Sequence, residues 1–335
     1  MRATVDPDSV FTTKERTMEY AIEAEGLVKR FGETVALAGV DFAVQRGSVL
    51  GMLGPNGAGK TTAVRILATL LKPDAGSARI SGYDVVTRAA DVRRAVGLTG
   101  QYASVDEALT GRQNLVMIGQ LLDLSGRAAR ARAAELLEWF GLKDAADRPA
   151  RTYSGGMRRR LDLAASLVGR PSVVFLDEPT TGLDPSKRED MWAIVRALVR
   201  DGATVLLTTQ YLDEADSLAD DIIVIDRGRV IAHDTPDGLK RIVGTQTLTV
   251  RPADAGQVAG VATILEAVTN STPTHEPRGL TVPVAGDAAM TETVRRLAAA
   301  GIAVTELSLN LPSLDEVFFT LTGHGTHENE IREAA

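Results

Sequence analysis

The stretch GPNGAGKTT at residues 54–62 constrains the fold of this chain more than any other part of the sequence. It begins at the end of the apolar run SVLGMLG and precedes AVRILATLL, in which apolar residues recur at helical spacing. Glycine tolerates unusual backbone angles, so consecutive N–H groups of such a loop can curl around phosphate oxygens, and the helix start behind them adds its dipole. The sequence therefore predicts a strand, a phosphate-binding loop (P-loop) and a helix in that order.

The P-loop and the helix start supply candidate contacts to a phosphate chain and a metal. Lys60 would reach the β- and γ-phosphates, and the Thr61 hydroxyl would ligate Mg²⁺. The predicted nucleotide contacts are Gly54, Pro55, Asn56, Gly57, Ala58, Gly59, Lys60, Thr61 and Thr62.

The segment VVFLDEP at residues 173–179 places two acids at the end of another strand-like run. Ligands of open α/β sheets bind at the carboxyl ends of the strands, so we expect this acid pair and the P-loop to meet in one crevice. Asp177 would then hold Mg²⁺ through water, and Glu178 would orient or deprotonate an attacking water. The alternative for a single acid at this position is that it caps the following turn.

The remaining pattern predicts an α/β chain with a smaller second domain. Apolar runs at 203–209 and 221–226 indicate further buried strands in parallel pairing, whereas 19–46 and 78–82 suggest an antiparallel edge sheet, and 105–170 is helical. We expect a parallel core sheet, an antiparallel β subdomain and a helical subdomain over residues 19–243, and a small α+β domain over 246–322. Residues 1–18 are expected to be a disordered extension or to precede the true start at Met18, and 323–335 to be a flexible tail.

Composition and charge exclude several classes of protein. The net charge of −7 and the pI near 5.3 disfavour general nucleic-acid binding, so no nucleic-acid partner is expected. The chain has no cysteine, which excludes disulfides and thiolate metal sites. No apolar run approaches the roughly 20 residues of a membrane helix.

The stretch YSGGM at residues 153–157 completes an ordered set with the P-loop, the acid pair and TTGLDP at 180–185. In this order the set resembles the ATP-binding cassette (ABC) ATPases, whose signature motif is usually LSGGQ; the resemblance covers about residues 19–240. It implies a P-loop NTPase domain of the ABC type, with ATP and Mg²⁺ as cofactors. The three arginines at 158–160 fan over about 200° of a helix and are interpreted as helix surface, with Arg158 near a dimer seam.

The resemblance also assigns roles to residues of the signature and of the loop behind it. In that family two copies close head to tail, so Ser154, Gly155 and Gly156 would act in trans on the γ-phosphate of ATP held by Lys60 of the second copy. Asp184 would lie at the dimer seam and link the two active sites.

Three more positions match the family pattern with different degrees of agreement. Phe31 in VKRFG would stack on adenine, the alternative being a buried phenylalanine at a strand end. Gln101 would sense the metal and the attacking water. Gln210 stands where the family usually carries a histidine; it can donate an amide hydrogen bond to the γ-phosphate but cannot carry a proton, so hydrolysis should rely on Glu178.

Three segments, GLTGQYASVDEALTGRQNL (97–115), TTQYLDEAD (208–216) and SLDEVFFTLTG (313–323), look closest to the daunorubicin/doxorubicin-resistance type of efflux ATPase. That type implies an ATP-hydrolysing homodimer on the cytoplasmic face of the cell membrane, which powers export of a drug-like or amphiphilic compound through a separate integral-membrane permease. Two alternatives stay open: a soluble ABC ATPase without a transport role, and a regulatory module that uses ATP as a dimer switch. The C-terminal domain would support assembly or merely stabilise the chain.

Overall fold

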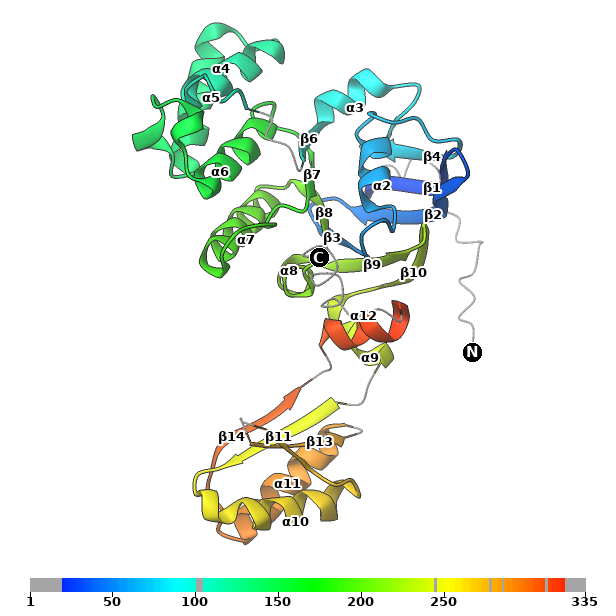
Figure 1. Ribbon diagram of the computed structural model, residues 1–335, viewed down its shortest axis with the longest axis vertical. Helices are drawn as coiled ribbons and strands as arrows, with labels where there is room; N and C mark the ends of the chain where they lie inside the picture. The colour runs from blue at the N-terminus through cyan, green and yellow to red at the C-terminus, as the bar shows by residue number, and fades with distance from the viewer. Residues whose placement is uncertain are drawn as a thin grey trace, which may run out of the picture. The chain divides into compact units, whose positions relative to one another are not determined.

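The computed structural model describes residues 20–100, 105–243, 246–276, 279–284, 286–310 and 313–322. The predictions for Gln101, for residues 1–18 and for the tail at 323–335 therefore lie outside the described residues. Contacts within the chain divide it into two compact units between His233 and Asp234, and each is described by itself (Figure 1).

The first unit is built on a six-stranded sheet in the order β10-β9-β3-β8-β7-β6. The pairs β9–β3, β3–β8, β8–β7 and β7–β6 are parallel. Every residue of β3, β7 and β8 is buried, which explains why these strands read as continuous apolar runs rather than alternating ones. The predicted parallel core is confirmed, and its strands are β3 (Val49–Leu53), β6 (Val96–Thr99), β7 (Val173–Asp177), β8 (Thr204–Thr209) and β9 (Asp221–Asp226). The sixth strand, β10 (Arg229–Asp234), lies at the edge of the sheet next to β9.

A four-stranded sheet in the order β2-β1-β4-β5 packs against the core sheet (Figure 1). Its pairs are antiparallel, as the sequence predicts, and its strands are β1 (Tyr20–Phe31), β2 (Thr34–Gln45), β4 (Ala75–Ile80) and β5 (Tyr83–Asp84). Leu27 and Leu37 of this sheet share one buried cluster with Leu50 and Phe175 of the core sheet. Helix α2 (Lys60–Leu67) buries its apolar face in the same cluster, which fixes the end that carries the P-loop.

Helices make up most of the segment between β6 and β7. Thr110 begins α4 (Gly111–Leu121) with a capping box to Gln113, and serines cap α5 (Gly126–Trp139) and α6 (Gly155–Ser166). The remaining helices of this unit are α3 (Ala89–Ala95), α7 (Pro185–Arg200), α8 (Leu212–Leu218) and the short 3₁₀ turns Lys143–Ala145 and Ala150–Thr152. The predicted helical region at 105–170 is confirmed.

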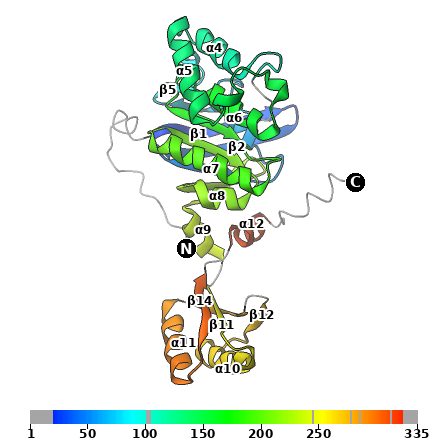
Figure 2. The same cartoon turned by 90° about the vertical axis from the view of Figure 1, so that its left-hand side faces the viewer.

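The second unit contains a four-stranded antiparallel sheet in the order β12-β13-β11-β14. Helices α10 (Val258–Thr269) and α11 (Asp287–Ala299) cover one face of it, and the two helices and the sheet share one buried cluster (Figure 2). The strands are β11 (Gln246–Pro252), β12 (Thr274–Glu276), β13 (Gly279–Val284) and β14 (Val304–Asn310). The order of strands and helices is β-α-β-β-α-β, a ferredoxin-like arrangement.

Two helices flank this small domain in the sequence and contact each other. Helix α9 (Pro236–Val243) packs on α12 (Leu314–Thr322). Helix α9 therefore groups with the C-terminal unit, whereas the sequence reading placed it at the end of the ATP-binding domain. Over the part of the chain that the structure describes, every helix is too short or too polar to span a bilayer.

Candidate functional site

The carboxyl ends of the core strands bring the predicted site segments to one edge of the sheet. In the parallel register Leu53 pairs with Thr209, and Asp177 pairs with Thr208. The P-loop follows Leu53 directly, Glu178 follows Asp177, and Gln210 follows Thr209. Three segments that are far apart in the sequence therefore emerge side by side at the edge where α/β sheets bind ligands (Figure 1).

The P-loop contains two glycines that no other residue could replace without strain. Gly59 has a φ of +110° and lies just before α2, and a Cβ there would lie 2.5 Å from the carbonyl oxygen of Ala36. A Cβ on Gly54 would lie 2.3 Å from the carbonyl oxygen of Ile225 in β9. The loop is thus held tightly between two neighbouring strands while its N–H groups and the start of α2 form the anion-binding end.

Lys60 occupies a buried position that suits a polyanionic ligand. Its Nζ donates to the carbonyl oxygens of Gly54 at 2.6 Å and Pro55 at 3.2 Å, and the residue is only 5% exposed. Burial lowers the pKa of Lys60, and the nearby carboxylates of Glu178 and Asp177 oppose that shift. The ammonium group therefore lies close to both acids at the loop, and it would gain most from an anionic phosphate.

Asp177 and Glu178 are fixed by the neighbouring strand β8. The Thr208 hydroxyl donates to Asp177 Oδ1 at 2.5 Å, and the Glu178 N–H donates to the Thr208 carbonyl oxygen at 3.0 Å. Glu178 has a φ of +50°, a left-handed conformation that is rare outside glycine, and it accepts a hydrogen bond from Thr181 at 3.3 Å. Such strain persists only where the surroundings enforce it, and it is frequent at active sites.

The donor atoms at this edge fit Mg²⁺. A buried Asp177 carboxylate and the half-buried Thr61 hydroxyl are hard oxygen ligands, which this ion prefers, and Lys60 balances the acidic charge. A full protein cage is not needed, because Mg²⁺ usually keeps waters and binds through one or two carboxylates plus substrate phosphates.

The signature residues lie at an exposed helix start. Ser154 caps α6 by accepting a hydrogen bond from the Met157 N–H at 3.3 Å, and both Ser154 and Gly155 are exposed. A Cβ on Gly156 would lie 3.0 Å from the flexible side chain of Lys187. An exposed N–H edge with little side chain over it can be approached closely by an anion from outside the chain.

Asp184 caps the next helix and shares Lys187 with the signature motif. Its carboxylate accepts a hydrogen bond from the Lys187 N–H at 3.1 Å and pairs with the ammonium group of the same residue. Hydrogen bonds from Lys187 lower the pKa of Asp184. Asp184 is exposed, as a residue at a seam between copies must be before assembly.

Phe31 and Gln210, the two predicted nucleotide contacts outside these motifs, are both exposed to solvent. The Phe31 side chain is 51% exposed at the end of β1, with Lys29 Nζ 5.7 Å from the ring centre. The alternative of a buried strand-end phenylalanine is therefore wrong. Gln210 is exposed at the end of β8.

Sequence reasoning missed two charged residues that are withdrawn from solvent, one half-buried and one fully buried. Arg159 is half-buried and donates to backbone carbonyls of the loop after β7, so the interpretation as plain helix surface is wrong for this residue. Glu214 is fully buried, its pKa is raised by that burial, and it accepts a hydrogen bond from the Trp192 indole at 3.3 Å. A signal for Arg159 was present, because it precedes the buried Leu163 by four positions and so shares its helix face.

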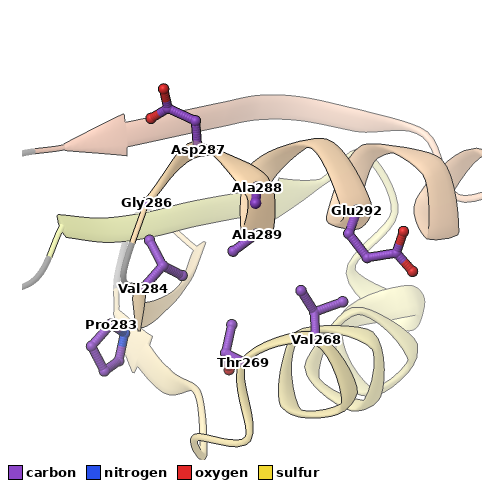
Figure 3. A pocket seen from close by; sticks show the side chains of 9 residues that line it. All are labelled: Val268, Thr269, Pro283, Val284, Gly286, Asp287, Ala288, Ala289 and Glu292. Atoms are coloured by element: carbon purple, nitrogen blue, oxygen red, sulfur yellow. The ribbon is translucent and has the colours of Figure 1, made fainter.

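The second unit has a hollow of about 490 Å³ between the end of α10, the end of β13 and the start of α11 (Figure 3). Val268, Val284 and Ala289 line it with apolar atoms. Its carboxylate Glu292 is already paired with Arg295, and hydrogen bonds from that arginine and its neighbour lower the pKa of Glu292 to about 2. The carboxylate of Glu292 is therefore already engaged by arginines outside the lining of this hollow.

Comparison with known sequences agrees with this geometry. Residues 37–181 match the sequence model of the ABC transporter family, and residues 235–322 match that of the C-terminal domain of DrrA1-3-like ATP-binding proteins. The chain is 55% identical to the daunorubicin resistance ATP-binding protein DrrA2 of Streptomyces coeruleorubidus, over 94% of this chain and 99% of the relative. It is 54% identical to the daunorubicin/doxorubicin resistance ATP-binding protein DrrA of Streptomyces peucetius, over 94% and 96% of the two chains.

Solved structures of ABC ATP-binding proteins match about two thirds of the chain. CbiO1 from Clostridium perfringens, part of an ABC transporter complex, aligns with a TM-score of 0.62 and 26% identity over 67% of this chain and 94% of that chain. A dimeric ATP-binding cassette bound to ADP and Pi, in a post-hydrolysis state, aligns with a TM-score of 0.58 and 26% identity over 64% of this chain and 98% of that chain.

Proposed function

Because the chain belongs to the ABC transporter ATP-binding proteins, and within them to the daunorubicin/doxorubicin resistance type, we propose that its ATPase cycle powers drug efflux. The exported compound is drug-like or amphiphilic, and it crosses the membrane through a separate integral-membrane permease. The ATPase chain works as a homodimer bound peripherally to the permease at the cytoplasmic face.

One observation carries the hydrolytic part of the proposal: the P-loop with the buried Lys60 follows β3, the acids Asp177 and Glu178 stand at the end of β7, and both strands pair with β8 at the same edge of the sheet. A buried cation at a P-loop together with two acids at the neighbouring strand end is the arrangement that phosphoryl transfer needs. Lys60 and the N–H groups of the P-loop bind the β- and γ-phosphates. Glu178 accepts the proton of the attacking water or orients that water, and its fixed backbone limits where the carboxylate can point.

The metal fits the same residues. Thr61, Asp177 and Gln101 would hold Mg²⁺, which supplies charge neutralisation on the phosphate oxygens when bound. Gln210 donates an amide hydrogen bond to the γ-phosphate and takes no proton. Phe31 stacks on the adenine ring.

The second half of each site comes from the other copy. Ser154, Gly155 and Gly156 are exposed or half-exposed at a helix start, and they contact the γ-phosphate bound by the P-loop of the partner copy. Asp184, next to them through Lys187, lies at the seam. Closure of the two copies around ATP is transmitted to the permease, and hydrolysis reopens them, because the γ-phosphate and its metal favour only the closed state.

The base is tested by Glu178→Gln, which keeps the size of the side chain and removes its basicity. We expect the variant to bind ATP normally and to hydrolyse it at least about 100-fold more slowly, which is the lower range for loss of a general base. Binding is measured by calorimetry and hydrolysis by phosphate release. Gln210→Ala is expected to be impaired to a smaller extent. Near-normal turnover by the Glu178→Gln variant would overturn the role of this carboxylate.

The shared site is tested by mixing two inactive variants, Lys60→Ala and Gly156→Asp. A mixed dimer combines the intact P-loop of one chain with the intact signature of the other, so it has one competent site. Random pairing should restore up to about a quarter of wild-type activity, since half of the dimers are mixed and each has one site of two. Full ATPase activity of either variant by itself, with no gain on mixing, would show that one chain carries a complete site and would contradict the composite site.

A further inference from the structure

Arg159 joins the signature helix to two loops at the catalytic edge of the sheet. From the second turn of α6, its Nε donates to the Pro179 carbonyl oxygen at 2.9 Å and its Nη2 to that of Glu178 at 2.8 Å. Its Nη1 donates to the Gly100 carbonyl oxygen at 2.9 Å. One side chain therefore joins α6 to the loop after β7, which carries the predicted base, and to the residue that follows β6.

The positive charge of Arg159 is also stabilised by acids around it. Burial lowers its pKa, while the acids Asp162, Asp177, Glu214 and Glu178 favour the charged form, in that order. A guanidinium group keeps its proton under such conditions and presents five N–H donors in a rigid plane. That planar fork allows contacts with four carbonyl groups at once, the fourth being that of Asp177 at 3.4 Å. A lysine in its place has one nitrogen and could satisfy only part of the set.

The same helix begins with Ser154, the first residue of the exposed signature edge. Ser154 and Gly156 serve the nucleotide held by the partner copy, whereas Glu178 serves the nucleotide held by its own chain. Arg159 is separated from Gly156 by less than one helical turn. A shift of α6 is therefore passed to the loop after β7 through the hydrogen bonds of Arg159 to the carbonyl oxygens of Glu178 at 2.8 Å and Pro179 at 2.9 Å.

We propose that Arg159 is a positioning residue that makes the orientation of Glu178 depend on the position of the signature helix of the same chain. When the signature of a chain engages ATP in one site, the Glu178 side chain of the same chain is oriented for catalysis in the other site. Each chain therefore couples the two sites of the dimer. The proposal rests on the composite ATPase site described above.

The decisive experiment places Arg159→Gln in one chain of a mixed dimer that has a single working base. One chain carries Glu178→Gln and the other keeps Glu178, and two different affinity tags allow purification of the mixed species. Only the site with the intact Glu178 turns over. The Arg159→Gln substitution is then introduced either into the chain with the intact base or into the chain with Glu178→Gln.

A positioning role predicts a large effect in the first placement and a small one in the second. We expect kcat to fall about 10- to 100-fold when Arg159→Gln shares a chain with the intact Glu178, because small misplacements of catalytic groups cost up to this much. The KM for ATP should stay within about twofold, since ATP-binding residues are unchanged. In the other placement kcat should stay within about twofold, and Arg159→Lys should recover part of the loss in the first placement.

Arg160→Gln is the matched control. Arg160 lies next to Arg159 on α6, is half-buried, and donates to the carbonyl oxygen of Phe140 at 3.1 Å within the helical region. Among the described residues it makes no hydrogen bond to the loop after β7. The same change of charge should therefore leave the kcat of the mixed dimer nearly unchanged in either placement.

Two outcomes would overturn the proposal. Equal loss in both placements would show that Arg159 only stabilises the fold, and loss only in the chain with Glu178→Gln would show that it positions the signature for the partner copy. Substantial turnover by a dimer with Glu178→Gln in both chains would instead contradict the proposed function itself, so the two failures are distinguishable. Thermal unfolding of each purified dimer confirms that the compared species are equally folded.

Discussion

Removal of the Phe31 ring should weaken ATP binding and leave the chemical step intact. The ring is 51% exposed at the end of β1, so about half of its surface can accept a base. Stacking of a base on an aromatic side chain contributes about 1–3 kcal/mol, and each 1.4 kcal/mol changes affinity about tenfold. Phe31→Ala should therefore raise the Kd for ATP by about 5- to 150-fold.

Because the Phe31 ring is half-exposed, its removal should lower the free energy of unfolding only moderately. Full burial makes a Phe→Ala change cost about 3–5 kcal/mol, so a half-exposed ring should cost no more than about 2 kcal/mol. Phe42 in the neighbouring strand β2 is 6% exposed, and Phe42→Ala should destabilise the chain by the full amount. The two substitutions separate the loss of a stacking surface from the loss of core packing.

The assay is calorimetric titration of ATP into chains that also carry Glu178→Gln, which prevents turnover during the measurement. Phe31→Trp serves as the conservative variant and should bind ATP at least as well as the parent chain, because its ring is flat and larger. Unfolding temperatures are recorded for each variant. An unchanged Kd for Phe31→Ala in a stably folded chain would refute the stacking role.

Three further substitutions test other parts of the structure. Gly59→Ala should abolish measurable ATP binding and destabilise the chain by about 1–3 kcal/mol, because its Cβ would lie 2.5 Å from a backbone oxygen of β2 and its φ of +110° disfavours any side chain; binding and chemical denaturation are the measurements. Thr208→Val keeps the side-chain shape but removes the hydrogen bond to Asp177, a charge-assisted bond that contributes about 1.5–3 kcal/mol, so the Mg²⁺ concentration for half-maximal turnover should rise. Glu292→Gln removes a carboxylate whose pKa is lowered from 4.5 to about 2 by its arginine partners, so its stabilisation is present above pH 4.5 and is lost as the pH falls toward 2. Its unfolding temperature should be lower than that of the parent near neutral pH, and the difference should narrow in acid; a constant difference would contradict the ion pairing.

Much of the first unit follows from local sequence. The runs that form β3, β7 and β8 are apolar at every position because the strands are buried on both faces, and this pattern was visible without coordinates. The P-loop glycines could be recognised from their spacing. The structure shows why glycine is required at two of these positions, because the backbone of another strand lies too close to Gly54 and Gly59 for a side chain. Order along the chain then predicted which strand ends would meet.

Other features depend on contacts that a local pattern does not encode. The strand β12 has only three residues, and its pairing with β13 turns a series of alternating strands and helices into a ferredoxin-like sheet. Helix geometry predicts correctly that the three arginines of α6 point in different directions. It does not predict which of these directions faces the catalytic loop. Arg159 points there because α6 packs beside the ends of β6 and β7, and that packing is set by residues elsewhere in the helical region.

Burial separates the two halves of the site on one chain. Lys60 and Asp177 are each 5% exposed and are held by strand contacts, so the half that grips the phosphates is preorganised before ATP arrives. Ser154 and Asp184 are exposed, and their capping bonds are made within their own helices. The exposed residues can therefore form contacts with a second copy without losing contacts inside their own chain, whereas the buried residues cannot. ATP would then act mainly on the association of two copies. Arg159 lies on the helix that Ser154 caps and contacts the loop that carries Glu178, so it is the residue through which that association can reach the base.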